Sequence, residues 1–262
     1  MNWVNASLFF YVAALAFALM HGGFRKRPLF VIAAVAAATG FALQTAFLAV
    51  GWVEHGFPPF ANLNELFRGT AWAILALFFA LYPLTRSKEL LFFLMPLITL
   101  IYFGGSLALP DPPVASKPFY FTAWFAVHIL LLLFGMASFF LSFLYASIFI
   151  MQDRSLRRRH APSPLPIPSL EESDRWSSRL LLIGYLPFTA GIFSSALYGI
   201  LHGGQSDYRP GLIEGASVLA WIVLGLAIYG WFSARVHPRR RAWLVVAGAA
   251  FSLLIIMGIV WH

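Results

Sequence analysis

The chain has 262 residues, of which 60% are hydrophobic and 11% are charged, and its formal net charge is +8. A soluble domain carries about 25% charged residues, so this composition excludes a soluble globular protein and indicates an integral membrane protein. The chain has no cysteine, which excludes disulfides and thiolate metal ligands. No phosphate-binding loop, zinc motif or nucleophile elbow occurs in the sequence, so it offers no self-contained catalytic constellation.

Long apolar stretches follow one another along the whole chain. Because a transmembrane helix needs about 20 mostly apolar residues, they predict eight spans, near residues 4–22, 29–51, 66–84, 89–109, 120–151, 178–201, 214–234 and 242–262. The N-terminal stretch lacks the basic start and small-residue cleavage site of a signal peptide, and predicts a retained first span. The predicted fold is an all-α bundle of about eight transmembrane helices, a single polytopic membrane domain over residues 1–262.

The basic residues are concentrated in alternate loops between these spans. The first, third, fifth and seventh loops hold 15 of the 18 Lys and Arg residues, and the opposite side keeps Arg68, Lys117 and Arg209. Positively charged loops stay in the cytoplasm. The pattern therefore predicts that both termini lie outside, in an N-out/C-out arrangement, and it removes any need to explain the positive charge by nucleic-acid binding.

The main polar interruption is "DRSLRRRHAPSPLPIPSLEESDRW", residues 153–176. Its arginine run and its prolines predict a cytoplasmic linker, with the arginines acting as topology anchors. The spacing from Ser169 to Glu172 fits a capping box and predicts that a helix starts there. Asn62 and Glu65 have the corresponding spacing before the third span, where capping and a functional role are both open.

The predicted topology sorts the seven histidines into two groups. His21, His160 and His237 fall on the cytoplasmic side. The outer half of the bundle holds His55 in the second loop, His202 in the sixth loop, His128 inside the fifth span and His262 at the end of the last span.

His128 is the most informative of these residues. An ionisable side chain inside a span is costly and usually faces the bundle interior, which favours a functional site. A neutral imidazole is also a common ligand of metals and haem iron. The alternative is a histidine that only forms a hydrogen bond with a neighbouring helix. The other three histidines also have an alternative to a ligand role. For His262 it is a chain end that tolerates many residues, and for His55 and His202 it is a solvated position in a loop.

Aromatic residues make up 17% of the chain, and several lie at the predicted outer ends of the helices. Trp124, Tyr208 and Trp261 are among them, with Arg209 next to Tyr208. Such residues fit an interfacial aromatic belt. They equally fit the walls of a slot for a flat, apolar, dianionic ligand such as a porphyrin, with Arg209 near a propionate.

Three stretches resemble the membrane haem-handling proteins of cytochrome c assembly, the CcsA/CcmC type. They are "GFPPFANLNEL" (56–66), "AWFAVHILLLLFGMASFFLSFLYASIFIMQ" (123–152) and "LPIPSLEESDRWSSRLLLIGYLPFTAGIFSSALYG" (165–199). The third is the most specific, because its ordered Pro, Gly and Thr positions match over its whole length. The resemblance covers roughly residues 50–262 and implies a protein of the bacterial cytoplasmic (inner) membrane.

In that family, two histidines flanking a tryptophan-rich outer loop hold haem. The resemblance carries these roles to His128 and His262 as axial ligands. The loop here, "HGGQSDYRPGLIEGASVLAW" (202–221), has Tyr208 and Ala216 where tryptophans are expected. The family's inner histidine pair is also missing, with Phe57 at its first position. These departures resemble the HemX-like branch, which lacks the full tryptophan-rich motif.

The resemblance implies a component of cytochrome c biogenesis that binds or relays non-covalent b-type haem at the outer face. Trp124, Tyr208 and Trp261 would pack the ring. The implied partners are apocytochrome c, a maturation protein with a large outer domain, and membrane lipid, so the chain would be one subunit of a cytochrome c haem lyase complex. Two alternatives remain: a HemX-like regulator or scaffold acting on haem biosynthesis, and a small-molecule transporter.

Overall fold

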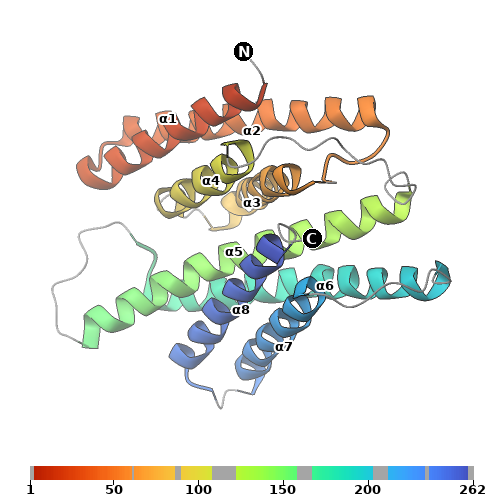
Figure 1. The fold of residues 1–262 in the computed structure, drawn as a ribbon. Coiled ribbons are helices and arrows are strands. Elements are labelled where there is room, and N and C mark those ends of the chain that lie inside the picture. Colours follow the sequence, from red (N-terminus) through yellow and green to blue (C-terminus); the bar gives the residue numbers. More distant parts are fainter. Residues whose placement is uncertain are drawn as a thin grey trace. The chain divides into compact units, whose positions relative to one another are not determined.

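The computed structural model describes residues 3–60, 62–85, 90–107, 122–157, 167–202, 212–233 and 236–258. Within these ranges the regular structure consists of eight helices and no strand (Figure 1). The helices are α1 (Trp3–Phe24), α2 (Arg27–His55), α3 (Leu63–Thr85), α4 (Leu90–Leu107), α5 (Ala123–Arg157), α6 (Leu170–His202), α7 (Leu212–Phe232) and α8 (Pro238–Gly258). The all-α prediction is confirmed.

Six of the described helices contain an apolar segment long enough to cross a membrane. These segments are Trp3–Phe24, Arg27–His55, Asn64–Thr85, Ala123–Arg157, Leu170–Tyr198 and Gly215–Phe232, and α4 contributes a shorter apolar helix over Leu90–Gly104. The chain is therefore an all-helical, multi-pass membrane protein.

The predicted capping residues start helices as expected. The Ser169 hydroxyl accepts a hydrogen bond from the Glu172 N–H at 3.2 Å, and Asn62 Oδ1 accepts one from the Glu65 N–H at 2.9 Å. Gly56 ends α2 in the left-handed conformation at φ 74°, with its N–H bonded to the Trp52 carbonyl. The capping role predicted for Asn62 is thus confirmed.

The α6 helix begins at Leu170, as the capping spacing from Ser169 predicted, and therefore earlier than the apolar span predicted over 178–201. Its first two turns are polar, yet Ser173 and Ser177 on them are buried, and Ser142 of α5 donates a 2.8 Å hydrogen bond to the Ser177 carbonyl. Packing on α5 therefore extends this helix to Leu170. The predicted linker at 153–176 is helical at both ends, since α5 continues to Arg157, and its arginine run from 158 lies outside the described residues.

The chain divides into two compact units. Unit 1 comprises Met1–Phe121 with Pro162–Pro168, and unit 2 comprises Thr122–Ala161 with Ser169–His262. In unit 1, which contains α1 to α4, the Tyr11 hydroxyl donates to Gln44 Oε1 at 2.5 Å, and Gln44 Nε2 donates to the Arg68 carbonyl at 2.6 Å. Tyr11 and Gln44 are fully buried, so this chain of bonds joins α1, α2 and α3 internally.

Unit 2 is built on the close pairing of α5 with α6, which lie side by side and antiparallel (Figure 1). Ser138 of α5 donates to the Leu180 carbonyl at 2.6 Å. A Cβ added at Gly135 would lie 2.8 Å from the Phe188 Cβ and 3.0 Å from its Cα, so only glycine lets α6 approach there. The α8 helix packs on α5 and α7.

The close approach at Gly135 gives a test of this packing. Gly135→Ala should lower the free energy of unfolding by about 1–3 kcal/mol, because the new methyl meets the backbone of α6 and the helices must separate. The measurement is thermal unfolding in mild detergent. Gly215→Ala is the matched control, because nothing lies within 4 Å of its Cβ position. Equal melting temperatures for both variants would contradict the close α5–α6 contact.

Candidate functional site

His128 lies near the start of α5 and is half-buried against α6. Its Nδ1 is 2.9 Å from the Gly191 carbonyl oxygen and 2.9 Å from the Ser194 hydroxyl oxygen. Because a carbonyl oxygen only accepts hydrogen bonds, Nδ1 carries the proton in this contact. The neutral imidazole therefore has its lone pair on Nε2, the form that can bind a metal ion.

The partners of His128 come from one turn of α6. Gly191 is packed against Leu132 of α5, with no room for a larger side chain without displacing that leucine. Ser194 donates a 2.8 Å hydrogen bond to the Gly191 carbonyl, so its hydroxyl sits beside the same oxygen that His128 contacts. The arrangement fixes both the ring orientation and the tautomer, as the outer hydrogen bond of a metal-binding histidine commonly does.

Trp124 precedes His128 by one helical turn and lies on the same face of α5. Its indole N–H donates to the Ser194 carbonyl at 3.0 Å, and its ring centroid is 6.0 Å from that of Tyr198. The structure thus brings together two of the residues that the sequence singled out. It adds Gly191, Ser194 and Tyr198, which were not predicted as site residues. The sequence signal that could have identified them was the third resembling stretch, whose ordered Thr and Gly positions include Gly191.

The other predicted site residues are not placed beside His128. Tyr208, Arg209, Trp261 and His262 lie outside the described residues. His202 ends α6, and its side chain is likewise outside the description. Among the described residues, no group of three or more His, Cys, Asp or Glu side chains is arranged to hold a metal ion.

His55 has a local role at the end of α2 in unit 1. Its side chain is exposed, and its Nδ1 is 2.7 Å from the Gly51 carbonyl in the last turn of that helix. Its ring lies 5.9 Å from that of Phe57. These contacts complete the last turn of the helix.

An aromatic contact from α7 reaches α6 near the site. Trp221 stacks on Tyr185 with a centroid separation of 6.0 Å and an interplanar angle of 14°. Its indole N–H donates to the Thr189 hydroxyl at 3.0 Å. Trp221 is the residue that keeps the tryptophan of the outer-loop pattern, and here it anchors α7 to α6.

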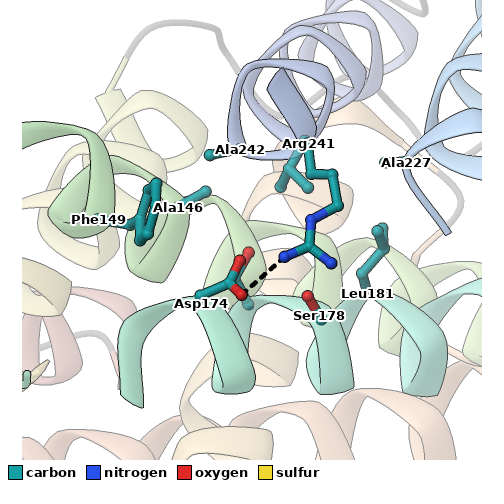
Figure 2. A pocket seen from close by; sticks show the side chains of 10 residues that line it. Ala146, Phe149, Asp174, Ser178, Leu181, Ala227, Arg241 and Ala242 are labelled. Atoms are coloured by element: carbon teal, nitrogen blue, oxygen red, sulfur yellow. Dashed lines mark hydrogen bonds and ion pairs between the residues drawn. The ribbon is translucent and has the colours of Figure 1, made fainter. Parts of the chain in front are cut away.

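The basic end of unit 2 contains a small hollow lined by α5, α6, α7 and α8 (Figure 2). Arg241 of α8 points across it to Asp174 of α6, with Nη2 2.8 Å from Oδ2. The neighbouring Arg239 lies 3.7 Å from Asp153 of α5. Two arginines of the α8 run therefore tie this helix to α5 and to α6, a structural role beyond that of topology anchors.

The fold and the site define the class of this protein: it is a multi-pass helical membrane protein. Near one end of its α5–α6 helix pair it has a half-buried histidine with a defined tautomer. Residues 2–262 match the family described as cytochrome C assembly protein. The chain belongs to the cytochrome c assembly protein family, and this confirms the resemblance. It is also similar to Protein HemX of Brevibacillus brevis, at 29% identity over 224 residues, 82% of this chain and 79% of that protein. Family membership assigns it a role in cytochrome c biogenesis, with haem as the molecule that the family handles.

The tautomer of His128 can be measured directly. NMR of isotope-labelled histidine in detergent micelles at neutral pH should show Nδ1 protonated and Nε2 unprotonated for His128, because the Gly191 carbonyl accepts from Nδ1. Ser194→Ala should keep this tautomer, since the carbonyl contact remains. His128→Ala assigns the signal by its loss. A protonated Nε2 at His128 would contradict the arrangement.

Proposed function

We propose that this protein binds or relays haem at the outer face of the membrane, for attachment to apocytochrome c. The observation that supports the proposal best is the hydrogen bond from His128 Nδ1 to the Gly191 carbonyl, 2.9 Å long. It leaves Nε2 as an imidazole donor of the kind that haem iron takes. Family membership supplies the cargo that such a donor would hold.

The second axial ligand in this proposal is His262, by its resemblance to the closing histidine of the family. Two imidazoles would saturate the iron and keep it from other ligands until transfer. His55 and His202 rank below His262. Neither of them stands at a position that the resemblance assigns to a ligand histidine: His55 lies two residues before Phe57, and His202 ends α6.

In this proposal the porphyrin ring contacts Trp124, Tyr208 and Trp261. Arg209 forms an ion pair with one of the haem propionates. Trp124 supports this role because its indole N–H is held by the Ser194 carbonyl at 3.0 Å, which fixes the ring one turn from His128. The haem would be b-type, because the chain has no cysteine for covalent attachment. It would be bound transiently, because in this proposal it is passed on to apocytochrome c.

The donor chemistry of the described residues fits haem at the His128 end. When bound, haem supplies the iron porphyrin that an apocytochrome receives on its Cys-x-x-Cys-His segment. His128 would bind and orient this cargo, and Gly191 and Ser194 would keep the imidazole in its binding form. We propose that the chain acts as a subunit of a cytochrome c haem lyase complex, beside a maturation protein with a large outer domain.

The proposal includes the membrane arrangement. Eight spans, near the predicted ranges, would make the two units one polytopic domain over residues 1–262 in the bacterial cytoplasmic membrane, with surrounding lipid and no nucleic-acid partner. Both termini would lie outside. The alternation of the 15 basic loop residues supports this orientation.

A regulatory role is the second candidate. The similarity to Protein HemX favours it, and so do the exposed arginines at the basic end of unit 2, Arg175 and Arg240 among them. In this role the chain would act as a membrane regulator or scaffold on an enzyme of haem biosynthesis, through its cytoplasmic surface and without haem of its own.

Absorption spectroscopy separates the two roles. The protein purified without a C-terminal tag should show a low-spin haem spectrum, which His128→Ala and His262→Ala each convert to high-spin or abolish, because each removes one axial imidazole. His237→Ala is the matched control, since His237 is an exposed histidine before α8. A haem-free protein, or haem unaffected by either variant, would overturn the axial-ligand assignment and favour the regulatory role.

The orientation has its own test, because a chain without cysteine accepts single-cysteine labelling directly. Glu54→Cys, at the exposed end of α2, should react with a membrane-impermeant thiol reagent in intact spheroplasts. Arg157→Cys, at the exposed end of α5, should react only after the membrane is opened. Each variant is the control for the other, and the reverse accessibility would contradict the N-out/C-out arrangement.

A further inference from the structure

The end of unit 2 where α8 begins has an excess of positive charge. Among its described residues, the arginines are Arg154, Arg157, Arg175, Arg179, Arg239, Arg240 and Arg241, and the carboxylates are Asp153, Glu171, Glu172 and Asp174. Seven cations against four anions leave a net charge of +3, with histidine counted as neutral. The arginines that have no carboxylate of their own are the ones that could bind an anion from outside the chain.

Three of these arginines are held by two aspartates. Asp153 of α5 pairs with Arg157 at 3.0 Å and with Arg239 of α8 at 3.7 Å. Arg241 pairs with Asp174 of α6 across the hollow in Figure 2. These arginines join helices of the same chain, and their charge is already balanced in part.

Two further arginines lie on the first turns of α6 beside acidic residues. Arg175 follows Glu171 by four residues and Glu172 by three, and opposite charges at these spacings lie on the same face of a helix. The Arg179 guanidinium lies 5.5 Å from the ring centroid of Trp176. The surface of α6 at this end therefore has a mixed charge.

Arg154 of α5 and Arg240 of α8 differ from the others. Both side chains are exposed, and within the described part of the chain neither forms an ion pair with a carboxylate. The Arg154 guanidinium lies 5.3 Å from the ring centroid of Trp243 of α8. Arg240 precedes Trp243 by three residues and so lies on the same face of α8. One exposed indole ring is therefore accompanied by two cations, one from each helix.

The surface next to these two cations is apolar. Trp243 is 44% exposed, and Met151, about one turn before Arg154 on α5, is 51% exposed. Trp243 also lies at the start of the last predicted span, and indole rings settle where hydrocarbon meets water. A ligand that covers this surface would be anionic at one end and apolar along its body.

We propose that Arg154, Arg240 and Trp243 form a binding site for an anionic phospholipid. The lipid phosphate lies at the two guanidinium groups, whose planar forks match phosphate oxygens. The acyl chains run along Trp243 and Met151. An acidic protein segment would use the arginines but would gain nothing from the exposed apolar surface beside them.

A phospholipid at this site contacts α5 and α8 at once, and so adds to the ion pairs that join these helices. In the proposed orientation it belongs to the cytoplasmic leaflet, where anionic lipids attract basic segments. Neither haem nor His128 takes part, so the inference is independent of the function proposed above.

The experiment uses the full chain in mild non-ionic detergent, titrated with phosphatidylglycerol or with phosphatidylcholine and followed by native mass spectrometry. The wild-type protein should bind its first phosphatidylglycerol roughly tenfold more tightly than phosphatidylcholine, because only the former has a net negative charge. Replacing Arg154 and Arg240 together by Gln should abolish most of this preference. Arg240→Gln alone should reduce it roughly threefold or more. This variant leaves the Arg154–Trp243 contact and all the ion pairs in place, so its effect cannot come from damaged packing.

Replacing Arg175 and Arg179 together by Gln is the matched control. It removes two exposed arginines from the same end of unit 2, one of which also lies over a tryptophan ring, and it should keep the preference. An equal loss in both double variants would overturn the site and leave only a general attraction between a basic surface and anionic lipid. A wild-type protein without the preference would overturn it as well. A polyglutamate peptide that binds more tightly than phosphatidylglycerol, and needs the same two arginines, would overturn the lipid as the occupant in favour of an acidic protein segment.

Discussion

The constraint on which unit 2 depends is that a polar side chain inside a bilayer must find its partner within the protein. On α5, four polar side chains meet this constraint in one way, by donating to backbone carbonyls of α6: Trp124 to Ser194, His128 to Gly191, Ser138 to Leu180 and Ser142 to Ser177. In this series the residue number of the donor in α5 rises as the residue number of its acceptor in α6 falls. The bonds therefore fix the antiparallel register of the two helices. Glycines at the contact keep the helices close enough for these bonds to form. His128 is therefore a member of the helix contact and a candidate ligand at once, because the bond through Nδ1 is the one that makes Nε2 available.

The basic end of unit 2 is held by a different kind of contact, between charged side chains. Charged pairs replace the carbonyl contacts: Arg241 meets Asp174, and Arg239 meets Asp153. The Arg154 guanidinium lies 5.3 Å above the ring of Trp243, a cation–π contact between α5 and α8. Arginines that sequence alone explains as topology signals thus also join three helices. In the described part of α8, these ionic contacts near its start fix the helix against α5 and α6.

Much of the fold could be predicted from the sequence, because hydropathy over about 20 residues decides whether a segment is buried in lipid. The caps at Asn62 and Ser169 were also predictable, since they depend on residues three positions apart. The start of α6 was marked by this spacing, but the buried serines that order its polar first turns against α5 could not be predicted from the sequence. In the same way, His128 could be identified as unusual, but Gly191 and Ser194 depend on the register between two helices. His55 illustrates the reverse: its sequence position fits a ligand, while its contact with Gly51 serves the helix end.

His128 and His55 share a local arrangement although they lie in different units. Each donates from Nδ1 to a carbonyl, and each has an aromatic ring nearby, Trp124 one turn from His128 and Phe57 at 5.9 Å from His55. A defined tautomer therefore does not identify a haem ligand by itself, because the same kind of contact completes a helix end at His55. His128 differs in that its carbonyl partner belongs to another helix. The bond from His128 therefore sets the register of α5 and α6 and holds Nε2 in place relative to both helices.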